Sequence, residues 1–129
     1  MISTVIADDS DDIRMLIRLQ LSRDGRFDIV GEAGDGQQAL DVIDARHPDL
    51  LLLDLAMPHM DGLEVLACLQ ARECRPPVVV FSGFASQTMI DRAMSLGAVA
   101  YIDKGRDLDE IAAILVEAVE QSSASAPTS

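Results

Sequence analysis

Five short apolar runs, each followed by a segment with helical periodicity, constrain the fold of this chain more than any other feature. In Leu50–Leu53 and in residues 78–81, apolar residues follow one another without polar alternation. Such runs are typical of parallel strands that are buried on both faces of a sheet. The pattern therefore predicts five strands, over residues 2–7, 28–33, 50–53, 78–81 and 99–102.

An amphipathic helix is expected after each strand. Ser10 and Asp61 are predicted N-caps of the first and third helices, and capping suits Asp61 better than a ligand role. Ser86 marks the start of the fourth helix, and Gly97 its end. The helices are expected over residues 11–23, 37–46, 63–69, 86–97 and 108–120. Strict alternation predicts an α/β fold: an open, doubly wound, parallel sheet with helices on both faces.

Length and composition fit a single domain. The chain has 129 residues, of which 49% are hydrophobic, enough to form one core without disulfides or metals. We expect this domain to cover residues 1–121, and the Ser- and Ala-rich residues 122–129 to be a flexible tail or linker remnant. The N-terminus does not resemble a signal peptide, and no apolar stretch approaches about 18 residues, so a cytoplasmic location is predicted.

The charge of the chain excludes one class of partner. There are 22 acidic residues against 10 Lys and Arg, which gives a formal net charge of -12. Such a surface repels phosphate backbones, so direct binding of DNA or RNA by this domain is not expected. The acidic residues either form a solvated surface or gather in part at a cation site.

Polar residues stand at the carboxyl ends of the expected strands. Asp8 and Asp9 follow the first strand and Asp54 follows the third. Ser82 and Lys104 follow the fourth and fifth. In a sheet of order 2-1-3-4-5, the first and third strands are neighbours at the switch point, where ligands bind. The three aspartates are therefore expected to lie together.

Three carboxylates in one pocket repel one another unless a cation or a proton intervenes. Oxygen ligands favour a hard cation such as Mg²⁺. With the Lys104 ammonium and the Ser82 hydroxyl, the pocket would hold the parts that phosphoryl transfer to a carboxylate requires. A single Asp at a strand end is commonly a helix cap, but four strand ends that supply matched groups favour a functional site.

Four motifs resemble the receiver domain of bacterial two-component response regulators. They are Asp8-Asp9, LLLLDLAMPHMDG at 50–62, VVVFSG at 78–83 and GAVAYIDK at 97–104. The resemblance covers about residues 2–120 and implies a flavodoxin-like (βα)5 fold that accepts phosphate from a histidine kinase. Residues 27–36 further resemble receivers attached to helix-turn-helix DNA-binding regulators.

The resemblance also implies roles for single residues at the phosphorylation site. Asp54 matches the phosphoacceptor and Lys104 the phosphoryl-binding lysine. Asp8 and Asp9 match the acidic pair that organises Mg²⁺, with Asp9 as the more direct ligand. Ala56 matches the position whose backbone carbonyl ligates the metal, so its side chain is no obstacle there.

Three further positions are implicated in switching and in the lifetime of the phosphorylated state. Ser82 matches the switch hydroxyl, and Tyr101 matches the switch aromatic residue that responds to it. Phe84 and Ala56 match the two positions that flank the hydrolytic water. Ala56 has no group that orients this water, and Phe84 either covers the phosphoryl group and excludes solvent or packs on the fourth helix. Slow hydrolysis is therefore expected. One departure is Gly105, which follows Lys104 where the family often has a proline, so the course of this loop, the isomer of the Lys104–Gly105 peptide and the exact reach of Lys104 stay open.

The predicted function is a phosphorylation-activated switch that changes the surface formed by its fourth helix, fifth strand and fifth helix. The resemblance implies a sensor kinase or phosphotransfer protein as partner and a homodimer on phosphorylation. It implies contact with DNA through an effector domain absent from this chain, and catalysis of its own phosphorylation and dephosphorylation alone. Two alternatives stay open, a Mg²⁺-dependent aspartyl-phosphate phosphatase and a pseudo-receiver that is never phosphorylated.

Overall fold

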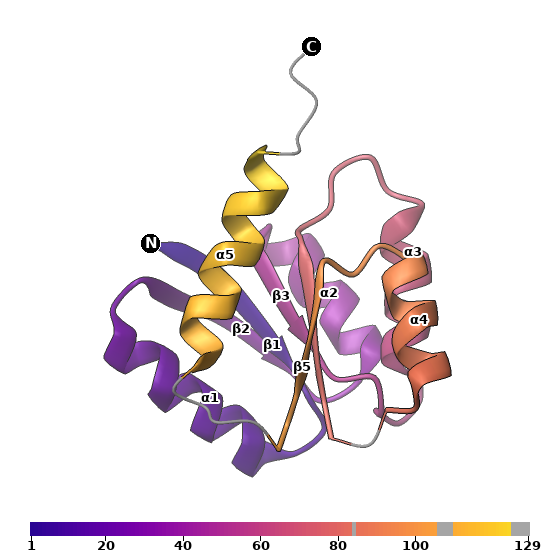
Figure 1. Ribbon diagram of the computed structural model, residues 1–129, viewed down its shortest axis with the longest axis horizontal. Helices are drawn as coiled ribbons and strands as arrows, with labels where there is room; N and C mark the ends of the chain where they lie inside the picture. The colour runs from indigo at the N-terminus through magenta and orange to yellow at the C-terminus, as the bar shows by residue number, and fades with distance from the viewer. Residues whose placement is uncertain (84, 106–109, 125–129) are drawn as a thin grey trace.

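A computed structural model describes residues 1–83, 85–105 and 110–124, with side chains as far as residue 122. Five parallel strands form one sheet in the order β2-β1-β3-β4-β5, and helices cover both of its faces (Figure 1). The expected fold class and strand order are confirmed. The elements are β1 (Ile2–Ala7), α1 (Asp11–Asp24), β2 (Phe27–Ala33), α2 (Gly36–Arg46), β3 (Leu50–Leu53), α3 (Gly62–Gln70), β4 (Val78–Ser82), α4 (Gln87–Ser95), β5 (Ala100–Asp103) and α5 (Ile111–Ala124).

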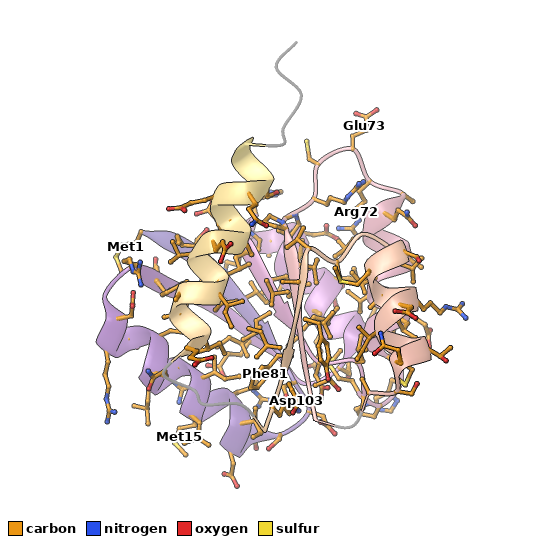
Figure 2. The ribbon with its side chains drawn as sticks, in the orientation of Figure 1. Met1, Met15, Arg72, Glu73, Phe81 and Asp103 are labelled. Atoms are coloured by element: carbon orange, nitrogen blue, oxygen red, sulfur yellow. The ribbon has the colours of Figure 1, made fainter. Side chains whose placement is uncertain are left out.

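The two faces of the sheet carry separate apolar layers. Along β3, Leu50 and Leu52 pack in the layer that α1 and α5 cover, whereas Leu51 and Leu53 pack in the layer under α2, α3 and α4. Phe81 of β4 lies in the first of these layers, between the sheet and α5 (Figure 2). Because successive side chains of a strand point to opposite faces, a central strand must be apolar at every position.

Side-chain caps begin the helices where the sequence predicts them. The Ser10 hydroxyl accepts a hydrogen bond from the Ile13 amide at 3.3 Å. The Asp61 carboxylate accepts one from the Glu64 amide at 2.9 Å, so Asp61 is a cap. Ser86 caps α4 in the same way. These bonds satisfy amide groups that the first turn of a helix leaves without partners.

The structure corrects several predicted element bounds near the site. Strand β4 continues to Ser82 and β5 to Asp103, because Ser82 still pairs with Asp103 in the parallel ladder. Helix α5 covers Ile111–Ala124 and so ends four residues later than predicted; no Gly or Pro interrupts the chain there. The predicted boundary at residue 121 thus falls inside this helix, and residues 125–129 of the predicted tail lie outside the described part.

No helix within the described residues is both long enough and apolar enough to cross a lipid bilayer.

Candidate functional site

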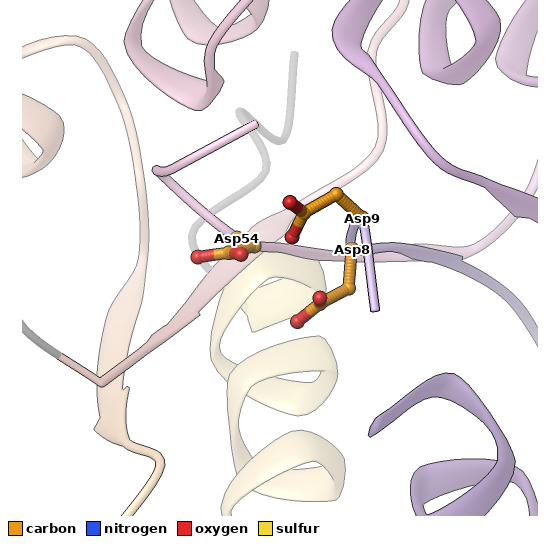
Figure 3. Close-up of side chains that lie close together, drawn as sticks. All are labelled: Asp8, Asp9 and Asp54. Atoms are coloured by element: carbon orange, nitrogen blue, oxygen red, sulfur yellow. The ribbon is translucent and has the colours of Figure 1, made fainter. Parts of the chain in front are cut away.

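Three carboxylates converge at the carboxyl edge of the sheet. Asp8 and Asp9 follow β1, and Asp54 follows the neighbouring β3. One carboxylate oxygen from each lies within 4.8 Å of the others, and Figure 3 shows the three side chains turned toward a common space. Asp8 and Asp54 are buried, whereas Asp9 is exposed. The expected acidic cluster is therefore present.

The parallel ladder places these residues, because its hydrogen bonds continue one step past the strands. The Asp8 amide donates to the carbonyl of Ala33 in β2 at 3.0 Å. The Asp54 amide donates to the carbonyl of Ala7 in β1 at 2.9 Å. Strand register thus brings Asp8 and Asp54 to the same depth in the edge of the sheet.

Lys104 reaches into this cluster from the end of β5. Its Nζ atom lies 2.7 Å from Oδ2 of Asp8 and 3.2 Å from Oδ2 of Asp54. Lys104 thus contacts both buried carboxylates although Gly105, and not a proline, follows it. Within the described residues no peptide bond is cis, the one between Lys104 and Gly105 included. The Gly105 amide instead donates to the Asp103 carboxylate at 2.7 Å, which holds the turn in place of a proline ring.

The electrostatics of the pocket are unbalanced toward negative charge. Burial and the charge of Asp8 raise the pKa of Asp54 above its usual value, although Lys104 and the Ala56 amide act in the other direction. Burial alone would lower the pKa of Lys104, but Asp8 and Asp54 outweigh burial and raise it. Among the described residues, the cluster has three carboxylates but only the one ammonium of Lys104, so a further positive charge would stabilise it.

The donor set fits a hard divalent cation. Asp8 Oδ1 accepts a hydrogen bond from the Ser10 amide, while Asp8 Oδ2 is buried and has an ion pair but no well-oriented hydrogen bond. Carboxylate and carbonyl oxygens with access to water are the ligands that Mg²⁺ takes in proteins. Asp8, Asp9, Asp54 and the backbone carbonyl of Ala56 are the groups that could hold it.

A cavity of about 270 Å³ opens beside Asp54. Its lining includes polar residues and also the apolar side chains of Ala85 and Met89. Its lining brings together most of the predicted site residues, namely Asp9, Asp54, Ala56, Ser82 and Lys104, and also includes Gly83. Met89 is a new member of the site, which sequence reasoning missed because its place in α4 also suits a core residue.

Ser82 and Tyr101 are connected through the main chain. Ser82 is buried, and its carbonyl accepts hydrogen bonds from the Tyr101 hydroxyl at 3.2 Å and from the Lys104 amide at 3.1 Å. Tyr101 is half-buried and packs against the apolar layer that also contacts Met89. Phe84, the other residue predicted to tune the phosphorylated state, lies outside the described residues.

Gly62 lies close against the backbone of Asp54 and Leu55. A Cβ atom at position 62 would collide with the carbonyl oxygen of Asp54 and lie 2.8 Å from the Cα atom of Leu55. The Gly62 amide donates to the Leu55 carbonyl at 3.0 Å. Glycine is therefore required where α3 begins, since any side chain would displace the backbone that carries Asp54.

Comparison with known proteins gives a consistent answer. A family model for the response regulator receiver domain matches residues 4–116. PdtaR, a transcriptional regulatory protein of Mycobacterium tuberculosis, is 35% identical over 107 residues, which are 83% of this chain and 51% of PdtaR. The chemotaxis protein CheY of Listeria monocytogenes is 33% identical over 120 residues, which are 93% of this chain and 100% of CheY. This chain spans about half the length of the curated relatives that match it first, at 51–53%.

Solved structures agree with this result. A structure described as the signal receiver domain of NarL from Mycobacterium tuberculosis has a TM-score of 0.88 at 32% identity and covers 92% of this chain and 96% of its own. A DNA-binding response regulator of the LuxR family from Staphylococcus aureus has a TM-score of 0.87 at 26% identity, with 92% and 99% coverage.

Proposed function

This chain belongs to the response regulator receiver family, whose members signal through phosphorylation, and on that premise we propose that Asp54 is its phosphoacceptor. The donor is a phosphohistidine of a sensor kinase or phosphotransfer protein, and Mg²⁺ binds at Asp8, Asp9, Asp54 and the Ala56 carbonyl. One observation carries the proposal: a buried carboxylate with a raised pKa lies beside two further carboxylates and a lysine. Receivers are phosphoacceptors rather than typical enzymes.

The reaction is a displacement at phosphorus. An Asp54 oxygen attacks the phosphorus atom, the bond from phosphorus to the donor nitrogen breaks, and that nitrogen keeps the electron pair. Bound Mg²⁺ would neutralise charge on the transferred oxygens. Lys104 would serve the same purpose, because its ammonium, 3.2 Å from Oδ2 of Asp54, can contact a phosphoryl oxygen after transfer.

Switching follows from the new charge. A phosphoryl group adds about -1.5 to -2 charge and strong acceptor oxygens, to which the Ser82 hydroxyl can donate. The Ser82 carbonyl accepts a hydrogen bond from the Tyr101 hydroxyl. A shift of Ser82 would therefore move the tyrosine ring and change the surface of α4, β5 and α5. We assign to this surface the control of a partner, a second copy or an effector domain.

The phosphorylated state decays slowly in this proposal. Hydrolysis requires a water molecule in line with the bond between Asp54 and phosphorus. Ala56 lies at the cavity and offers a methyl group that cannot orient water. The resemblance gives Phe84 the second position that flanks the water, where a large apolar side chain would exclude solvent.

The donor protein is expected to dock on α1, which begins beside the acidic cluster. Met15, Leu16 and Leu19 are exposed apolar side chains of this helix, at 44%, 47% and 50% exposure, and Met15 points away from the sheet in Figure 2. Their spacing places them on one side of the helix. Contiguous exposed apolar groups mark an interaction surface, and this one belongs to the helix that begins two residues after Asp9.

Reaction with an acyl phosphate in the presence of Mg²⁺ tests the proposal. Peptide mass spectrometry should find the phosphoryl label on Asp54, and the Asp54→Ala variant should remain unlabelled. A label that survives this substitution undiminished would exclude Asp54 as the acceptor. Continued release of inorganic phosphate from a small phosphate ester would favour the phosphatase alternative. Absence of any label from acyl and protein donors would favour a pseudo-receiver.

A further inference from the structure

The carboxylates of the acidic cluster differ in how they are held. The Asp8 carboxylate accepts a hydrogen bond from the Ser10 amide and forms an ion pair with Lys104. The Asp54 carboxylate accepts a hydrogen bond from the Ala56 amide. Among the described residues, none bonds to the exposed carboxylate of Asp9. Its position therefore depends on the backbone that carries it.

That backbone is fixed through the peptide between Asp8 and Asp9. Arg14 Nη1 donates to the carbonyl oxygen of Asp8 at 2.5 Å. Because the peptide is planar, the direction of the Asp8 carbonyl also sets the direction of the Asp9 amide and the place of its Cα atom. The Asp8 amide is itself bonded to Ala33, so both ends of this residue are held.

The Arg14 guanidinium is in turn anchored by Glu32 of β2 and by Asp11 of its own helix. Its Nε donates to Glu32 Oε1 of β2 at 3.2 Å, and its Nη2 pairs with the Asp11 carboxylate in α1. The Arg14 side chain is 16% exposed. A planar fork with several donors suits a bridge between three acceptors, which the point charge of a lysine could not reproduce.

We propose that Arg14 is a positioning residue that orients Asp9 for Mg²⁺ by holding the Asp8 carbonyl. The inference rests on the proposed function, since it assigns Mg²⁺ to this cluster. The positioning role of Arg14 and its positive charge predict opposite effects of its removal on the affinity for Mg²⁺. Removing a cation near three carboxylates would by itself strengthen Mg²⁺ binding, whereas releasing the peptide would weaken it.

Arg18 is a matched control for Arg14. It lies one turn further along α1 and donates to the other oxygen of Glu32 at 2.6 Å, a contact that does not involve the acidic cluster. Replacing Arg18 with Met therefore removes one positive charge and one bond to Glu32, as replacing Arg14 does, and leaves the Asp8 carbonyl bonded.

Calorimetric titration of the unphosphorylated chain with Mg²⁺ tests this. We expect Arg14→Met to weaken Mg²⁺ binding about tenfold, in the range typical for groups that orient metal ligands. We expect Arg18→Met to bind as wild type or more tightly. Glu32→Gln, which keeps the side-chain shape and weakens the anchor of Arg14, should give a smaller loss in the same direction. Circular dichroism melting of the Mg²⁺-free variants checks that each is folded.

The outcomes separate this inference from the proposed function. If Arg14→Met and Glu32→Gln bind Mg²⁺ as tightly as Arg18→Met while Asp9→Asn binds weakly, the role of Arg14 is wrong and the metal site stands. If Arg14→Met does not fold, Arg14→Lys decides between these readings in the same titration, because it keeps the positive charge but cannot bridge the three acceptors. If Asp9→Asn binds like wild type, the metal assignment fails and the role of Arg14 fails with it.

Discussion

The ammonium of Lys104 lies 3.2 Å from Oδ2 of Asp54, across 50 residues of sequence. The proposed nucleophile is thus paired before any donor arrives, yet its pKa remains raised, because burial and Asp8 outweigh the lysine. The ionised pocket is therefore a source of instability in the absence of a metal ion.

This imbalance predicts a pH dependence of stability. A carboxyl whose pKa is raised on folding binds its proton more tightly in the folded state. Without Mg²⁺, the free energy of unfolding should therefore rise as pH falls from neutral through the raised pKa of Asp54, until the pKa of the unfolded chain is reached. The Asp54→Asn variant should lack this rise in the free energy of unfolding, and at neutral pH it should be more stable than the wild type. Urea unfolding of both proteins at several pH values measures it; parallel profiles would contradict the assignment.

Gly62→Ala should damage both stability and phosphorylation. The added Cβ would collide with the Asp54 carbonyl, and overpacking of this kind costs about 1–3 kcal/mol. Gly34→Ala is the control, because its Cβ would meet its nearest neighbours, Gln38 and Arg14, at 3.6 Å and 3.7 Å, which are ordinary contacts. Chemical denaturation and the rate of labelling by an acyl phosphate are the measurements. Equal behaviour of the two variants would rule out the close approach.

His47→Gly should stabilise the domain. His47 ends α2 with φ of 46°, in the left-handed region that a side chain makes unfavourable by about 1 kcal/mol. The converse change is Gly25→Ala at the end of α1, where φ is 83° and a Cβ would meet no neighbour within 4 Å. Opposite shifts of the melting temperature are expected for the two variants. Shifts of the same sign would show that something other than backbone conformation dominates.

Docking of the donor protein on α1 predicts variants that lose phosphotransfer from that protein but keep labelling by a small phosphodonor. Leu16→Ser combined with Leu19→Ser should slow phosphotransfer from a histidine phosphotransfer protein at least several-fold and leave labelling by an acyl phosphate unchanged, since the small donor needs no surface. Met94→Ser, which changes an exposed apolar residue of α4, is the control. The docking assignment fails if the control slows protein-mediated transfer as much as the double variant does.

The lifetime of the phosphorylated state should respond to Ala56. Ala56→Asn places a hydrogen-bonding group at the cavity and should speed dephosphorylation in Mg²⁺ by about tenfold, a modest part of what water orientation can contribute. Phe84→Ala should act in the same direction by opening the site to water. Loss of label over time, followed by mass spectrometry, gives both rates; if neither variant decays faster, these side chains do not set the lifetime.

The sequence by itself determined the architecture of this protein. Runs such as Leu50–Leu53 and caps such as Ser10 and Asp61 are local signals, and each was sufficient to place its element within a few residues. The general rule for doubly wound sheets then brought Asp8, Asp9 and Asp54 to one edge. Helix α5 shows the limit of such signals, because nothing local marks an end at residue 120.

The tertiary structure alone decided how the site residues contact one another. The pairing of Lys104 with both Asp8 and Asp54, the approach of Gly62 to the Asp54 carbonyl and the bond from Arg14 to Asp8 follow no sequence pattern. They depend on strand register, on the path of the loops and on side-chain rotamers. These are set by packing between elements distant in sequence, so a local pattern can name the groups at the edge of a sheet but cannot orient them.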